Sequence, residues 1–193
     1  MNPQTALDGI ERSAAPRAFV IMGVSACGKT TVGRTLAERV GWDFLEGDTM
    51  HPESNVAKMS AGIPLTDADR RPWLDHIADW IAQRLDAGEN SVVACSALRR
   101  IYRDRLRTAG EGVRFVYLKV PREILLQRLQ GRKHFMPASL LDSQLDTLKE
   151  PDTDENALTV EATCDINNTV KQIQAALNAR RVRASATPDS APQ

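Results

Sequence analysis

The chain has 193 residues, of which 42% are hydrophobic and 26% charged, as expected for one globular domain with a substantial core. Lys plus Arg and Asp plus Glu both number 25, so no overall basic field would attract nucleic acid or an anionic membrane, and we expect neither as a partner. No apolar run approaches the ~20 residues that span a bilayer.

The two ends of the chain are predicted to be flexible tails. Residues 1–16 and 182–193 are rich in Ala, Ser, Pro and Asp and show no sustained periodicity. A single domain over residues 17–181 is expected between them. The three cysteines are odd in number and widely spaced, which indicates reduced thiols in a cytoplasmic protein.

Apolar runs and helical patterns alternate through the first half of this domain. A buried strand is predicted over 19–22, and the helix that follows it has apolar residues at every fourth position and ends at Gly41. Residues 42–45 form a short second strand. Pro72 is placed as a first-turn proline of the next long helix.

The same alternation continues to the end of the domain. Strands are predicted over 91–95, 113–120 and 158–163, and helices follow each of them. Pro121 and Pro137 are predicted to open two of the helices. Strands that alternate with helices predict an α/β fold with a parallel sheet covered on both faces, in which ligands bind beyond the carboxyl ends of the strands.

The segment GVSACGKT, residues 23–30, matches the phosphate-binding pattern G-x-x-x-x-G-K-[ST] between a predicted strand and a predicted helix. Glycines let successive backbone N–H groups turn inward, and the helix N-terminus adds partial positive charge. Lys29 would reach the β- and γ-phosphates of a nucleoside triphosphate, and the Thr30 hydroxyl would bind Mg²⁺. The residues predicted to bind the cofactor here are Gly23, Val24, Ser25, Ala26, Cys27, Gly28, Lys29, Thr30 and Thr31.

Cys27 lies inside this loop and has two possible roles. The helix N-terminus and Lys29 would favour its thiolate, which predicts a reactive thiol that bound ATP shields. Alternatively, Cys27 fills space as a packed and inert side chain.

Polar groups follow the second and third predicted strands. Asp48 comes directly after the second strand, where a carboxylate can accept a proton from an attacking hydroxyl. Two polar segments, residues 51–71 and 96–104, stand at neighbouring strand ends and suit an anionic, polyhydroxylated acceptor. An arginine fork there would match a carboxylate through two hydrogen bonds.

Four segments together resemble the gluconokinase family: GVSACGKT, EGDTMHPESNVAKMSAGIPLTDADRRPWL, VVACSALRRIYRDRLR and HFMPASLLDSQLDTLKEP. The resemblance covers about residues 17–178. It implies a P-loop kinase fold with a small helical lid at about 128–140, and transfer of the γ-phosphoryl group of ATP to the 6-hydroxyl of D-gluconate. It also implies a possible homodimer.

The resemblance assigns roles to matching positions of this chain. It implies that Asp48 and Lys29 are catalytic, that Arg70 binds the gluconate carboxylate, and that lid arginines 128 and 132 close on the phosphates. The remaining substrate contacts that it implies are His51, Lys58, Ser96, Ala97 and Arg103. Thr30 and Glu46 are the expected metal site, with Glu46 standing where many relatives have an aspartate.

Two other functions remain open from the sequence. One is a kinase for another small hydroxy acid, such as shikimate, against which the segment HPESNVAKM argues. The other is a regulatory protein that hydrolyses nucleotide slowly. ADP release measured with and without gluconate tests the regulatory alternative: strong stimulation by gluconate supports the kinase, and equal basal release supports the regulatory protein.

Overall fold

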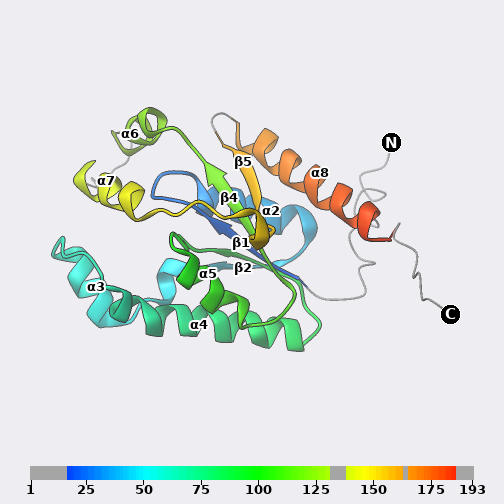
Figure 1. The fold of residues 1–193 in the computed structure, drawn as a ribbon, viewed down its shortest axis with the longest axis horizontal. Coiled ribbons are helices and arrows are strands. Elements are labelled where there is room, and N and C mark those ends of the chain that lie inside the picture. The colour runs from blue at the N-terminus through cyan, green and yellow to red at the C-terminus, as the bar shows by residue number, and fades with distance from the viewer. Residues whose placement is uncertain (1–16, 131–137, 163–164, 186–193) are drawn as a thin grey trace.

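Five apolar segments pair into one sheet in which every neighbouring pair of strands is parallel. The computed structural model describes residues 17–130, 138–162 and 165–185. The strands lie in the order β2-β3-β1-β4-β5 (Figure 1). Their bounds are β1 (Ala18–Met22), β2 (Asp43–Glu46), β3 (Ser91–Ala94), β4 (Val113–Lys119) and β5 (Leu158–Glu161).

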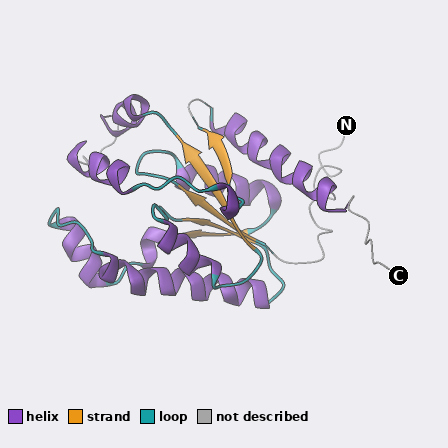
Figure 2. Ribbon diagram, viewed as in Figure 1, coloured by secondary structure: helices purple, strands orange, loops and turns teal. Residues whose placement is uncertain are grey.

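Helices connect the strands and cover both faces of the sheet (Figure 2). Within the described ranges, none of them is long and apolar enough to cross a membrane. The α-helices are α2 (Lys29–Val40), α3 (Glu53–Ser60), α4 (Asp67–Asp86), α5 (Arg100–Arg107), α6 (Arg122–Gln130), α7 (Ala138–Thr147) and α8 (Ile166–Ser185). Two short 3-10 helices are η1 (Gly47–Met50) and η2 (Thr153–Glu155).

The strands alternate their side chains between two separate cores. On one face, Ile21 of β1 packs with α2, α6, α7 and α8. On the other face, Val20 and Met22 pack with α4 and α5. Because β1 is buried on both sides, its sequence AFVIM is apolar throughout, as a central strand of a parallel sheet requires. The predicted doubly covered parallel sheet is therefore confirmed.

Two boundaries and one additional helix differ from the prediction. Helix α4 begins at Asp67, so Pro72 lies inside it rather than in its first turn. Thr66 and Asp69 form a reciprocal capping box, which fixes the start of α4 five residues before the proline. Helix α8 continues to Ser185, past the predicted tail boundary at 181. Helix α3 has no counterpart among the predicted elements, and Pro137 lies outside the described residues.

Candidate active site

The phosphate-binding loop connects the end of β1 directly to α2. Gly23, Ala26 and Gly28 all have positive φ angles, of 139°, 65° and 105°, which curl the backbone into a concave turn. A Cβ at Gly23 would lie 2.8 Å from Cys27 Sγ and 3.0 Å from the Leu118 carbonyl, so only glycine fits. Lys29 Nζ donates to the Val24 carbonyl at 3.1 Å, which places its ammonium over the loop.

Cys27 is buried, with 1% of its surface exposed, and it packs against Gly23. This geometry favours the packing role over the reactive thiol. Arg128 of α6 forms hydrogen bonds with the backbone of the same part of the loop. Its guanidinium donates to the Ala26 carbonyl at 3.3 Å and the Cys27 carbonyl at 3.2 Å, and also to Ala162 at 2.9 Å. A direct contact of Arg128 with phosphate stays a prediction, and Arg132 lies outside the described residues.

The turn after β2 crosses the end of β3 at very close range. A Cβ on Gly47 would lie 2.5 Å from the Ala94 carbonyl oxygen, so a side chain at this position is excluded. Trp73 Nε1 donates to the Gly47 carbonyl at 2.7 Å and fixes the turn from α4. Gly47 thus holds Glu46 and Asp48, its two acidic neighbours, at the carboxyl end of the sheet.

Three charged side chains that were predicted to act in the site lie near the buried thiol of Cys95. Burial raises the pKa of Cys95 to about 12, and the charges of Asp48, Lys29 and Glu46 all act on it. Asp48 itself is exposed, in the first turn of η1. The structure therefore brings the loop lysine and both acidic side chains to the same end of the sheet. The sequence predicted this grouping because each of these segments directly follows a strand of a parallel sheet.

Two stacked rings and one buried side-chain amide organise the predicted acceptor segment, residues 51–71. The ring of His51 stacks on Trp73 with centroids 4.2 Å apart. Asn55, 2% exposed, places its Nδ2 3.3 Å from His51 Nδ1 and donates to the Asp69 carbonyl at 2.8 Å. Lys58 Nζ lies 2.7 Å from Asp69 Oδ1. These contacts join η1, α3 and the start of α4 into one polar surface.

The charge states of this surface follow from its contacts. Burial lowers the pKa of His51, with Asp48 opposing that shift and Arg70 adding to it. His51 is therefore neutral at pH 7 and can either donate or accept a hydrogen bond. Hydrogen bonds from Lys58 and Thr66 lower the pKa of Asp69 to about 2, so this carboxylate stays ionised.

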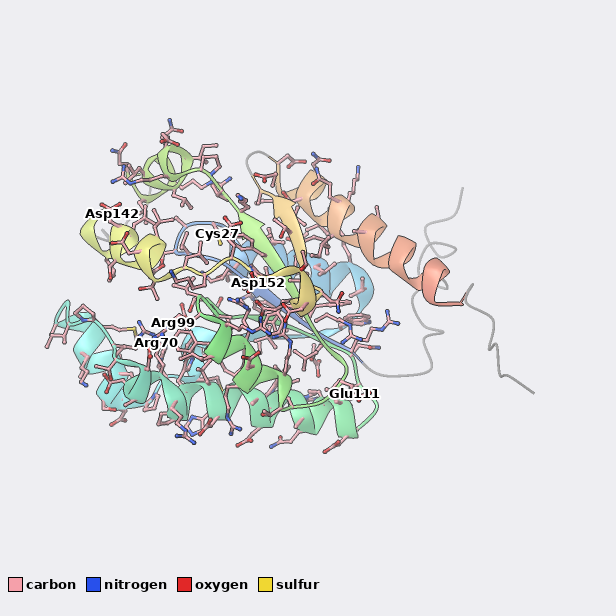
Figure 3. All side chains as sticks on the ribbon, in the orientation of Figure 1. Cys27, Arg70, Arg99, Glu111, Asp142 and Asp152 are labelled. Atoms are coloured by element: carbon pink, nitrogen blue, oxygen red, sulfur yellow. The ribbon has the colours of Figure 1, made fainter. Side chains whose placement is uncertain are left out.

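Arg70 lies beside Arg99, and both guanidinium groups face the ring of Tyr102 (Figure 3). Arg70 Nη1 donates to the Leu65 carbonyl at 2.6 Å and approaches Tyr102 Oη at 3.4 Å. Tyr102 Oη in turn donates to Asp67 at 2.5 Å. Among the residues that the structure describes, Arg70 makes these hydrogen bonds through Nη1, and Nη2 is therefore available for a carboxylate.

The turn after β3 connects the acceptor side to the phosphate loop. Ala97 is buried and has a φ angle of +43°, and the Ser96 carbonyl accepts a hydrogen bond from Gly23 N at 3.2 Å. Because the Ala97 methyl group is buried, only the backbone of this residue could face a substrate. Contact of Ser96 and Ala97 with substrate stays a prediction.

Arg103 has a different role from the one predicted. Its side chain is 0% exposed, as is that of Glu155, and the two form a salt bridge with hydrogen bonds of 2.6 and 2.7 Å. Nη1 donates to the carbonyls of Ala97, Leu98 and Lys149. Because these bonds occupy its donors inside the protein, Arg103 supports the acceptor turn from behind and does not contact substrate.

Comparisons with known proteins agree with this geometry. A family model described as an AAA domain matches residues 19–151. The gluconokinase of Gluconobacter oxydans is 53% identical over 146 residues, which cover 75% of this chain and 82% of that protein. The chain belongs to the gluconokinase family.

Solved structures extend the comparison to the fold. A gluconokinase from Sinorhizobium meliloti superposes with a TM-score of 0.78 at 41% identity, covering 91% of this chain and 100% of that chain. Shikimate kinase from Aquifex aeolicus gives a TM-score of 0.56 at 15% identity, covering 86% and 98%. The second likeness shows the shared P-loop kinase fold alone, and the first matches the predicted gluconokinase resemblance.

Sequence reasoning missed several side chains that organise this gluconokinase-family site. Trp73 received no role from the sequence, although it donates a hydrogen bond to Gly47 and stacks on His51. Tyr102 links the two arginines to Asp67. A capping pattern, Thr66 to Asp69, was present in the sequence and indicates the true start of α4.

Proposed function

We propose that this protein is an ATP-dependent gluconokinase that converts D-gluconate and ATP to 6-phospho-D-gluconate and ADP. The observation that carries the proposal is one polar surface, from His51 to Arg70, in a chain that belongs to the gluconokinase family. The charge of Asp48 acts on His51 of this surface, and the charges of Asp48 and of the loop residue Lys29 both act on Cys95. Membership alone supports a phosphoryl transfer to a sugar acid. The geometry supports particular residues for each part of that reaction.

Arg70 is the proposed contact for the gluconate carboxylate. Its guanidinium is held by the Leu65 carbonyl on Nη1, which orients Nη2 without neutralising the charge. His51 and Lys58 would donate to hydroxyl groups along the acceptor chain. Since His51 is neutral, it adds no charge that would compete with Arg70 for the carboxylate.

Asp48 is the proposed general base. It is exposed at the end of the sheet, where it would accept the proton that the 6-hydroxyl loses as its oxygen bonds to the γ-phosphorus. The bond between the γ-phosphorus and the bridging oxygen breaks in the same transfer, and ADP leaves. Lys29 and the inward N–H groups of the loop would stabilise the charge on the phosphate oxygens.

A magnesium ion fits the residues at this end of the sheet. Glu46 Oε2 is buried and has no hydrogen-bond partner within the part of the chain that the structure describes, so a positive or donating group would satisfy it. Thr30, exposed in the first turn of α2, is the second proposed ligand. When bound with ATP, the ion would neutralise the charge that develops on the phosphates.

Three further features belong to this proposal. The acceptor is a small molecule, D-gluconate, and the enzyme is proposed to act as a homodimer, which light scattering would test. A cytoplasmic location agrees with the two buried, unpaired thiols Cys27 and Cys95.

The proposal is tested by ADP release in a coupled assay with MgATP and four acceptor conditions. These are D-gluconate, glucose as the matching neutral aldose, shikimate, and buffer alone. The proposal requires strong stimulation by gluconate, with little by glucose or shikimate. Stimulation by shikimate would support the other hydroxy-acid kinase, and equal ADP release in all four conditions would support a nucleotide-hydrolysing regulatory protein.

A further inference from the structure

A polar side chain of helix α7, that of Gln144, contacts the phosphate loop. Gln144 Oε1 accepts a hydrogen bond from the backbone N–H of Ser25 at 2.7 Å, across 119 positions of sequence. Gln144 is half-buried, and the sequence of α7, ASLLDSQLDT, contains no Lys or Arg. In Figure 1, α7 lies over the same end of the sheet as the loop. The roles assigned above to the site do not include Gln144.

Ser25 lies close in sequence to the contact between the loop and the turn after β3. It is the third loop residue, and Gly23, two positions earlier, is bonded to Ser96 of the acceptor turn. Loop N–H groups are the donors that bind phosphate oxygens, and those at the start of α2 lie at the opposite end of the loop. Gln144 therefore contacts the loop two residues after the point where the loop bonds to the acceptor turn.

The hydrogen bond to Ser25 also determines which way the Gln144 amide points. A side-chain amide has an oxygen that accepts and a nitrogen with two donors. Since Oε1 is used by Ser25, Nε2 remains as a pair of neutral donors at the edge of the loop. Within the described ranges, the structure records no partner for Nε2.

We propose that Gln144 is a contact residue for the γ-phosphoryl group, with Oε1 anchored on Ser25 and Nε2 donating to a γ-phosphate oxygen. This inference rests on the proposed nucleotide site but not on the identity of the acceptor. The contact links α7 to the presence of the third phosphate. A neutral donor stabilises the oxygens without adding a charge that would hold the group after its transfer.

The test compares binding of two nucleotides to three variants of the full chain in the absence of gluconate. The probes are ADP and the non-hydrolysable β,γ-imido analogue of ATP, each with Mg²⁺, measured by calorimetry. Gln144→Glu keeps an oxygen for Ser25 but replaces the donors with a negative charge, and Gln144→Ala removes both ends. Gln127→Glu makes the same charge change at an exposed position of α6 and is the matched control.

We expect Gln144→Glu to raise the Kd of the ATP analogue about 10- to 100-fold, which is the range for a lost hydrogen bond to a charged group. The Kd of ADP should rise less than about threefold. Gln144→Ala should show the same selectivity to a smaller extent, and Gln127→Glu should change neither. Melting temperatures of the nucleotide-free variants report whether the fold is intact.

Two results would overturn the inference. An equal loss of affinity for ADP and for the ATP analogue would mean that Gln144 only holds α7 against the loop. Tighter binding in Gln144→Ala would make it a side chain that nucleotide must displace from the loop. Because gluconate is absent from every arm, the result is independent of whether the chain phosphorylates gluconate.

Discussion

The buried salt bridge between Arg103 and Glu155 makes a quantitative prediction about stability. Both side chains are 0% exposed, and Glu155 also accepts from Arg107 at 3.1 Å and from Asp152 N at 3.1 Å. Glu155→Gln keeps the size of the side chain but leaves the Arg103 cation buried without its counter-ion. Breaking a buried pair in this way costs about 3–5 kcal/mol in the free energy of unfolding. For a domain of this length, that corresponds to a melting temperature lower by roughly 6–20 °C.

A surface pair of the same geometry is the matched control. Arg122 and Asp142 also form two hydrogen bonds, of 2.8 and 3.1 Å, but their side chains are 48% and 45% exposed. Asp142→Asn should therefore cost less than about 1 kcal/mol. Urea denaturation of both variants measures the difference. If Glu155→Gln is no more costly than Asp142→Asn, burial is not what makes the Arg103 pair important, and the reasoning is refuted.

The pH dependence of stability gives an independent check on the same pair. Pairing with Arg103 is the main cause that lowers the pKa of Glu155 to about 2. A carboxylate whose pKa is lowered on folding contributes stability that is present above its unfolded value, near 4.5, and is lost as the pH falls toward 2. Wild type should therefore lose more stability between pH 5 and 2 than Glu155→Gln does. Equal losses would contradict the assigned role.

Three further predictions concern the reaction and the loop. Asp48→Asn should lower kcat by about 10²–10⁴-fold with little change in ATP affinity, because a general base acts only in the transfer; turnover near wild type would remove Asp48 from this role. Arg70→Lys should raise the KM for gluconate about 10- to 100-fold, because lysine lacks the planar guanidinium that bonds both carboxylate oxygens. An equal rise in the KM for glucose would mean that Arg70 orients its segment and does not bind the carboxylate. Cys27 should react slowly with iodoacetamide in the folded enzyme, because only 1% of its surface is exposed. Mass spectrometry would measure the labelling. Rapid labelling that MgATP blocks would support the reactive-thiol hypothesis instead.

The parts of the fold that the sequence predicted are those that local pattern specifies. The run AFVIM is apolar because β1 is buried on both faces, and the loop motif followed it in the expected context. Gly41 ends α2 with a φ of 69°, as its position indicated. These features depend on neighbours along the chain, so sequence alone is enough to place them.

The predictions failed where they depended on which face of a helix is buried, or on hydrogen-bond partners that are distant in sequence. Arg103 stands among other arginines of α5, and nothing local shows that it shares the buried face with Tyr102 and Leu106. Its partner Glu155 is 52 positions away. Gln144 likewise reaches Ser25 across 119 positions. Pro72 misled the prediction because the capping box at Thr66 had already started the helix.

The most direct test of the central claim is to identify the product. The purified protein is incubated with MgATP and D-gluconate, and the mixture is analysed by phosphorus and carbon NMR. We expect one new phosphate monoester at carbon 6 of gluconate, formed in equal amount to ADP. ADP without a phosphorylated sugar acid, or a phosphate on another carbon, would contradict it.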